Sequence, residues 1–460
     1  MYFEARLPPL SFKNYFIVSD KNRVFGDVHI QLPKTNKDKN IFEASLPGIN
    51  VELVTTPSSI ENEILKVSFD ETGIKSIKLK KEDKLHKISQ SYWEYPSDSN
   101  WGNHYTFKPS GEPTKITFSK LSSDFRVIKT DLFEEFTFRA ADLIWQTVRV
   151  FTSQSFVEVV ETVGPPRRST DIVSRYQTEW DLENKFYTDD SGLEMVQRTF
   201  NTSQQLSGNY FPTVYSCFIR EHKKNTEYPN QLSYIMDTPH GVTSSQPGNL
   251  EIMIHRNNVQ SLANGEPLND NTVATVRSWL LLQPKDNSKR QQYSMKLNFP
   301  LIGVTSNDNI NLDSIHKFSN DGLSFLKQSF PDDIFLTSFE RYFNGKPKTI
   351  ATRVNHLRQS DGVDYYDKLA LESKPNAEIP LQLFNGPSLK VSNVEERMLS
   401  LNKSPEECKR NHWHHIDEAP HTAKLGSLVA VPNYLTHSVG NTSTISLSPM
   451  SIRSFFINFD

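Results

Sequence analysis

Two neighbouring carboxylates and one histidine-rich segment are the residues of this sequence whose types could do chemistry. Asp189 and Asp190 lie side by side between Tyr187 and Gly192. Two carboxyl groups that work as a catalytic pair must face a common substrate, whereas adjacent residues of a strand point to opposite faces. Aspartate is also common in turns, because its carboxylate accepts hydrogen bonds from the turn's own amides. The pair therefore predicts a hairpin turn rather than a catalytic site.

The histidine-rich segment reads ECKRNHWHHIDEAPH. Its side-chain types suit zinc, but their spacing matches neither a zinc finger nor an H-E-x-x-H helix. The candidate ligands are Cys408, His412, His414, His415, Asp417 and His421. A solvated loop with incidental histidines is favoured, so we expect no metal ligand here. No nucleophile elbow, phosphate-binding loop or dinucleotide fingerprint occurs in its required setting, and the residues alone identify no catalytic group.

Charge and hydropathy exclude several classes of partner. The 460 residues include 51 basic and 54 acidic side chains, for a formal net charge of −3, and neither sign forms a long run. This balance argues against nucleic acid or an anionic membrane as a partner. The longest apolar runs are far shorter than the roughly 20 residues of a membrane-spanning helix. We therefore expect no membrane span, and the first residues lack the pattern of a signal peptide.

The elements that must position any site are predicted to be strands. With 29 Phe and 16 Tyr, the composition favours strands over helices. Residues 64–69 and 74–79 form a plausible hairpin, and 143–163 reads as two strands joined at TSQS, with Val148 and Val150 alternating against Gln146 and Arg149. A short helix is expected around 321–328. The prediction is an all-β protein of several sandwich domains with little helix.

Composition also suggests where the domains begin and end. The chain is too long for one core, and polar stretches lie at 306–314 and 372–378. We expect closing strands of an upstream β-domain at 1–20, a large β-supersandwich at 21–304, a connecting β segment at 305–371, and a small β-sandwich at 372–460.

The order of segments between 143 and 268 resembles a known family. The segments are QTVRVFTSQSFVEVVETVGPP, DIVSRYQT, FYTDDSGLEMVQRTFN, SGNYFPT, QLSYIMDTPHGVTSS, GNLEIMIHR and GEPLND. Together they closely resemble the C-terminal β portion of glycoside hydrolase family 38, the alpha-mannosidases, above all the lysosomal ones. LPPLSFKNYFIV near the start and SLSPMSIRSFFINF at the end extend the likeness over nearly the whole chain. The resemblance implies a supersandwich of the galactose mutarotase type.

In that family the reaction is retaining hydrolysis of terminal alpha-linked mannose. The zinc ligands and both catalytic carboxylates lie in an N-terminal barrel, which this sequence does not resemble. The resemblance thus implies no catalytic residue and no cofactor on this chain, with zinc bound by a separate catalytic N-terminal chain. Implied partners are that chain and mannose-containing glycans, and the implied compartment is the lysosome or secretory lumen. The alternative is a stand-alone, degenerate carbohydrate-binding module.

The same resemblance implies three residues at the rim of the sugar pocket. The turn SGNYFPT matches a turn whose aromatic side chain faces the sugar, which makes Tyr210 and Phe211 candidates, and Phe211 stands where the family has tyrosine. The missing hydroxyl removes a polar contact of about 1 kcal/mol. The segment HRNNVQSLANGEPL lacks the family's rim arginine and offers Asn264 instead, which cannot replace the donors of a guanidinium.

Overall fold

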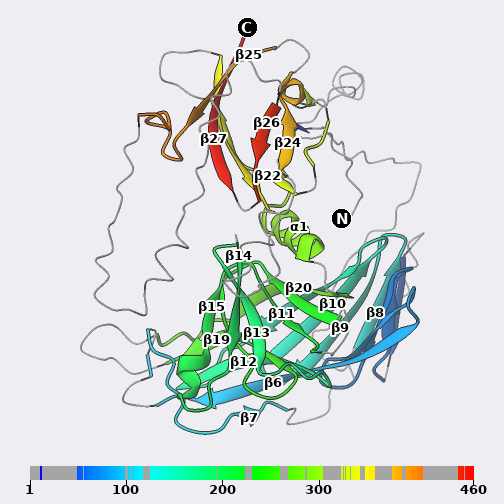
Figure 1. The fold of residues 1–460 in the computed structure, drawn as a ribbon. Coiled ribbons are helices and arrows are strands. Elements are labelled where there is room, and N and C mark those ends of the chain that lie inside the picture. Colours follow the sequence, from blue (N-terminus) through cyan, green and yellow to red (C-terminus); the bar gives the residue numbers. More distant parts are fainter. Residues whose placement is uncertain are drawn as a thin grey trace, which may run out of the picture. The chain divides into compact units, whose positions relative to one another are not determined.

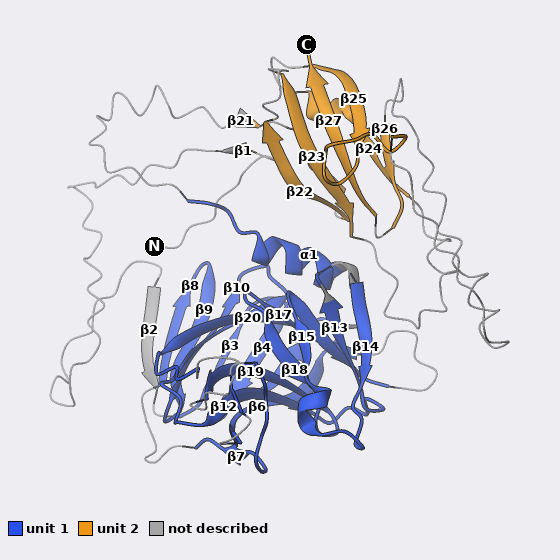
Figure 2. Cartoon of the chain, turned by 90° about the vertical axis from the view of Figure 1, so that its left-hand side faces the viewer, with its two compact units in different colours: residues 1–4, 17–304, 361–365 blue, residues 5–16, 305–360, 366–460 orange. Residues whose placement is uncertain are grey.

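The computed structural model forms two compact units, which Figure 2 distinguishes by colour. Unit 1 contains the described residues of 17–304, and unit 2 contains those of 5–16, 305–360 and 366–460. The structure describes residues 11–12, 49–54, 56–98, 102–103, 105–117, 125–192, 194–222, 230–258, 268–284, 287–303, 323–324, 326, 328–331, 333–341, 348–357, 376–385, 390–407, 444–449 and 451–460.

Unit 1 is built from two large antiparallel sheets (Figure 1). The first consists of β2 (Ile49–Val54), β8 (Phe125–Thr130), β9 (Phe133–Ala141), β10 (Ile144–Phe151), β11 (Phe156–Val163), β13 (Lys185–Asp190), β14 (Glu194–Thr199), β16 (Ser216–Arg220), β17 (Asn230–Met236) and β20 (Ala274–Pro284). Within the described residues this ten-stranded sheet has the order β14-β13-β16-β17-β20-β11-β10-β9-β8-β2.

The second sheet has nine described strands. They are β3 (Ser59–Glu61), β4 (Leu65–Phe69), β5 (Ile74–Leu79), β6 (Lys84–Pro96), β7 (Thr114–Lys115), β12 (Thr170–Thr178), β15 (Phe211–Thr213), β18 (His240–Thr243) and β19 (Asn249–Asn257). Their order is β15-β18-β19-β12-β6-β5-β4-β3, and β7 pairs with β6. A 3-10 turn, η1 (Leu206–Asn209), precedes β15.

A single apolar core lies between the two sheets. Side chains of both, such as Phe136 and Val148 from the first and Ile88 and Ile172 from the second, belong to one buried cluster. Strand β10 buries every second residue, which is the period of a half-buried strand. Burial of this alternating set is the main stabilising contribution to the sandwich.

A polar cluster is enclosed within this core. The Glu161 carboxyl is fully buried, and its Oε1 accepts hydrogen bonds from Tyr92 OH at 2.6 Å, Gln90 Nε2 at 2.9 Å and Ser174 Oγ at 3.2 Å. Gln146 Nε2 donates to Tyr92 OH at 2.7 Å. Burial raises the pKa of Glu161 to about 7, although its hydrogen bonds oppose this shift.

Gln146 corrects one prediction from the sequence. The alternation placed it opposite Val148 and Val150, but it shares their buried face and is 1% exposed. An amide is tolerated there because Glu161, Gln90 and Tyr92 form a buried hydrogen-bonding cluster that it can join.

One helix packs on the opposite face of the ten-stranded sheet. Helix α1 (Asn287–Asn298) directs Tyr293 and Leu297 onto Phe156, Trp279 and other apolar residues of that face. Residues 287–298 carry no strong apolar period, so a helix there could not be predicted from the sequence.

Unit 2 is a smaller β structure. Among the described residues of this unit, a four-stranded sheet has the order β22 (Ile334–Arg341), β23 (Thr349–His356), β27 (Ile452–Phe459) and β25 (Val391–Arg397). Two-stranded pairs are formed by β24 (Ala377–Pro380) with β26 (Thr444–Leu447) and by β1 (Ser11–Phe12) with β21 (Leu323–Ser324). The 3-10 turn η2 (Leu381–Phe384) contributes to a core around Phe384 and Phe455.

The structure confirms the all-β prediction and both hairpins. Strand β4 pairs with β5, and β10 pairs with β11, all antiparallel. The predicted helix at 321–328 is wrong, because Leu323 and Ser324 form β21 and pair with Phe12 and Ser11. The four-segment division of the chain stays a prediction.

Candidate functional site

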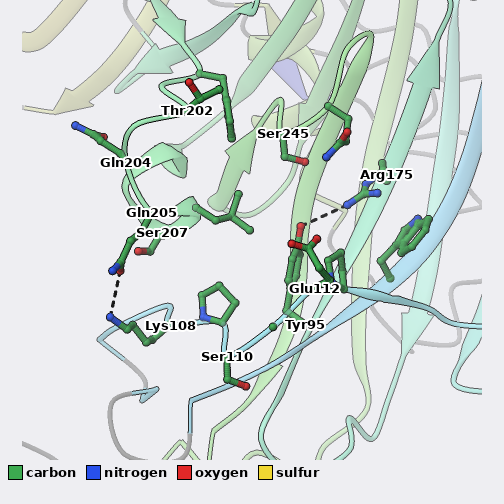
Figure 3. Close-up of a pocket in the computed structure, with 17 residues that line it drawn as sticks. Tyr95, Lys108, Ser110, Glu112, Arg175, Thr202, Gln204, Gln205, Ser207 and Ser245 are labelled. Carbon is green, nitrogen blue, oxygen red and sulfur yellow. Dashed lines mark hydrogen bonds between the residues drawn. The ribbon is translucent and has the colours of Figure 1, made fainter.

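A hollow of about 720 Å³ lies on the outer face of the nine-stranded sheet, away from the apolar core. Strands β6 and β12 form its floor, and two loops at 108–113 and 200–207 form its walls (Figure 3). The lining residues are Trp93, Tyr95, Lys108, Pro109, Ser110, Gly111, Glu112, Pro113, Arg175, Phe200, Thr202, Gln204, Gln205, Leu206, Ser207, Ser245 and Gln246. We call it the Arg175 hollow.

A buried ion pair supports its floor. Arg175 Nε donates to Glu251 Oε2 at 2.7 Å, and Glu251 is fully buried. The other carboxylate oxygen accepts hydrogen bonds from Tyr95 OH at 2.9 Å and from Tyr210 OH. Burial, followed by the charge of Glu251, raises the pKa of both tyrosines. Both hydroxyls therefore remain protonated donors that hold the carboxylate in place.

An aromatic group borders this ion pair. The Arg175 guanidinium lies 4.5 Å from the ring centroid of Trp93, a cation–π distance. Trp93 Nε1 donates to Ser91 Oγ at 2.9 Å, so the polar atom of the indole is satisfied within the protein. The Trp93 side chain thus offers the hollow a mainly apolar surface.

Local contacts fix the two loops. The Asn209 side chain accepts from Asn201 N at 2.7 Å and donates to Asn201 O at 3.0 Å, which closes the 200–207 loop. Lys108 Nζ donates to Gln205 Oε1 at 3.1 Å and joins the two walls. Gly248, at φ +75°, ends the turn that carries Ser245 and Gln246, and a Cβ there would lie 2.4 Å from Thr178 O.

The predicted rim residues fall in different surroundings. Tyr210 bonds to Glu251 directly behind the hollow. Phe211 packs against the core of the sandwich, with its ring centroid 5.7 Å from that of Phe186 and 4.5 Å from the Arg198 guanidinium carbon. Neighbouring residues of an extended chain face opposite ways, so Phe211 does not line this hollow. Asn264 lies outside the described residues.

Asp189 has a structural role. It is buried near the end of β13, and its carboxylate accepts from the backbone amides of Gly192 at 2.8 Å, Val214 at 2.8 Å and Tyr215 at 3.0 Å. Burial raises its pKa despite these hydrogen bonds. The sequence correctly predicted bonding to turn amides, although Asp189 itself belongs to the strand.

The described part of the chain contains no candidate metal site and no candidate membrane-spanning helix. No group of three His, Cys, Asp or Glu side chains there could hold a metal ion. The histidine-rich segment from Cys408 to His421 lies outside the described residues. Among the residues described, no helix has the length and apolarity to cross a membrane.

The lining of the hollow suits recognition better than bond cleavage. Among its described residues, Glu112 is the one carboxylate, whereas glycoside hydrolysis uses a pair of carboxyls across the sugar. Sequence reasoning missed Trp93, Tyr95, Arg175 and Glu251. An arginine and a glutamate within the apolar strands at 171–178 and 249–257 were the available signal.

Comparisons with known proteins agree with the fold. Residues 60–264 match the profile of the family described as "Glycosyl hydrolases family 38 C-terminal domain". The chain is 23% identical to lysosomal alpha-mannosidase of Dictyostelium discoideum over 99% of its own length, and 23% identical to lysosomal alpha-mannosidase of Bos taurus over 97%. It spans 46% of the length of each of these relatives.

A solved structure is similar in fold. The crystal structure of an alpha-mannosidase from Enterococcus faecalis matches with a TM-score of 0.55 and 12% identity, covering 88% of this chain and 43% of that one. At this identity the likeness concerns the fold alone. Together with the family profile and the relatives, it makes residues 60–264 similar to the glycosyl hydrolase family 38 C-terminal domain.

Proposed function

We propose that the chain is the C-terminal, non-catalytic part of an alpha-mannosidase-like glycoside hydrolase. It would act with a catalytic N-terminal part on terminal alpha-mannose of N-glycans and oligomannosides. The observation that carries the proposal is the match of residues 60–264 to the family 38 C-terminal domain profile, in a chain that aligns along 99% of its length with 46% of an alpha-mannosidase. Zinc and both catalytic carboxylates would come from the N-terminal part.

The surroundings of the buried carboxylates support a non-catalytic role. Glu251 is neutralised by Arg175, and Asp171 pairs with Arg256 at 2.7 Å. Asp189 is occupied by backbone amides. Each of these carboxylates stabilises strands and turns, and none of the three lines the Arg175 hollow.

The compartment is proposed from the relatives, several of which are named lysosomal. We therefore propose the lysosome or secretory lumen as the compartment of this chain.

Co-expression tests the proposal. The N-terminal part of the Dictyostelium lysosomal alpha-mannosidase would be produced with and without this chain, and aryl alpha-mannoside hydrolysis and native mass would be measured. The proposal expects a stable complex that hydrolyses the mannoside, and an N-terminal part that is inactive or insoluble alone. A chain that stays monomeric and adds nothing to activity would contradict it.

A second candidate function is saccharide binding by the chain itself, as a module that works without a catalytic partner. The observation that favours it is the Arg175 hollow, whose lining is rich in hydroxyl and amide side chains next to Trp93. Saccharide binding by the isolated chain, together with no effect on the N-terminal part, would favour this second candidate over the first.

A further inference from the structure

The Arg175 hollow has the electrostatics of a site for an uncharged ligand. Arg175 is matched by Glu251 directly behind it, and the lining holds one further cation, Lys108, and one carboxylate, Glu112. No excess of either sign remains on the lining. A phosphate or carboxylate ligand gains most from a cluster of cations, whereas the formal charges of Lys108, Glu112, Arg175 and Glu251 cancel here.

Hydrogen-bonding groups without protein partners are available to a ligand. Arg175 uses Nε and Nη2 for Glu251 and Tyr95, and its Nη1 has no partner among the described residues. The same holds for the side chains of Thr202, Gln204 and Ser207 on one wall, within the described part of the chain. Hydroxyl, amide and guanidinium groups can together donate to and accept from sugar hydroxyls.

Apolar surface lies beside these polar groups. Trp93 lines the hollow, and the Arg175 guanidinium lies over its ring. Phe200, Pro109 and Leu206 add further apolar surface. The volume of about 720 Å³ falls in the range of small-molecule sites. A ligand that presents hydroxyls on its edges and C–H groups on its faces fits both kinds of surface.

We infer that the Arg175 hollow binds a neutral, hydroxyl-rich saccharide, with Trp93 as the platform for a sugar face and Arg175 Nη1 as a fixed donor to its hydroxyls. The loop at 200–207 closes over the ligand from one side, and the loop at 108–113 from the other. The choice of mannose as the first sugar rests on the proposed function. The inference that the site binds a neutral saccharide does not depend on that function.

Calorimetry on the purified full chain tests the inference, with alpha-1,2-mannobiose, maltotriose and glucuronic acid as probes. Binding of a neutral saccharide with a Kd of about 1 mM or tighter, and weaker binding of the acid, are expected. The Trp93→Ala variant should weaken binding at least tenfold. Trp145→Ala is the matched control, because Trp145 is an exposed tryptophan of β10 on the other sheet, and it should bind as the parent chain does.

Two further measurements distinguish a loss of saccharide binding from misfolding of the variant. Arg175→Lys keeps the positive charge that Glu251 requires but removes the fixed Nη1 donor, and it should weaken binding while circular dichroism stays unchanged. Hydrogen exchange on the unsubstituted chain should slow at 105–113 and 200–207 when saccharide is added. No binding of either neutral saccharide, tighter binding of the acid, or equal losses in Trp93→Ala and Trp145→Ala would overturn the inference.

The outcomes also separate this inference from the proposed function. Binding of maltotriose but not mannobiose would support the saccharide site and count against the mannose assignment. Failure of both neutral sugars, combined with active co-expression with the N-terminal part, would overturn the site and leave the proposed function standing.

Discussion

The buried Glu161 predicts that unit 1 is more stable at acidic pH. In the unfolded chain its carboxyl titrates near the ordinary value of 4.5, and in the folded chain it titrates near 7. Between these values the folded state binds the proton more tightly, so stability falls as pH rises through this window. The gap corresponds to about 3 kcal/mol, at about 1.4 kcal/mol per pH unit.

Substitution Glu161→Gln should remove most of this pH dependence. The glutamine oxygen can accept the hydrogen bonds of Tyr92 and Gln90, but its amide would replace Oε2, which has no partner among the described residues. This unpaired donor should cost about 1 kcal/mol. The variant is therefore expected to be about 1 kcal/mol less stable than the parent at pH 4 and about 2 kcal/mol more stable at pH 8.

Urea unfolding at several pH values measures both quantities. Tryptophan fluorescence reports mainly on unit 1, because five of the six tryptophans belong to it, namely Trp93, Trp101, Trp145, Trp180 and Trp279. Glu179→Gln is the control, since Glu179 is an exposed partner of Lys87 and its loss should leave the pH profile unchanged. Equal pH profiles for the parent and Glu161→Gln would refute the reasoning.

Three further predictions concern the neighbourhood of the hollow. Replacing Arg175 by Met should destabilise unit 1 by about 3 to 5 kcal/mol, because Glu251 would be left buried and unpaired. The double variant with Glu251→Met should recover most of this lost stability in urea unfolding. Additive losses from the two single substitutions would contradict the prediction. Asp189→Asn should cost about 2 kcal/mol through its backbone amide bonds, and a change under about 0.5 kcal/mol in the same assay would rule out that role. Phe211→Ala should destabilise unit 1 by about 2 kcal/mol but leave saccharide binding in calorimetry unchanged. Weaker binding by this variant would show that the ring lines the sugar site.

Periodicity predicted the elements whose partners are close in sequence. The hairpins at 65–79 and 144–163 have short turns and clear alternation, so local sequence was enough to predict them. Strand β21 pairs with β1, more than 300 residues away, and no local pattern reports such a partner. Helix α1 is stabilised by a few contacts to Phe156 and Trp279 rather than by an apolar stripe of its own.

The candidate site was harder to predict from the sequence than the fold. The family turn made Tyr210 a candidate rim residue, which stays a prediction, and the structure shows that its hydroxyl bonds to Glu251. Trp93 and Arg175 come from different strands, and only the pairing of β6 with β12 brings them together. A single sequence gives no register between distant strands, so the ion pair of the floor could not be predicted from it.

The most direct test of the central claim is hydrolysis of an aryl alpha-mannoside by the purified chain alone, with zinc added. We expect no turnover above the buffer blank, and hydrolysis once the N-terminal part of an alpha-mannosidase is supplied. Turnover by the chain alone, abolished by a chelator, would contradict the claim that this chain is non-catalytic.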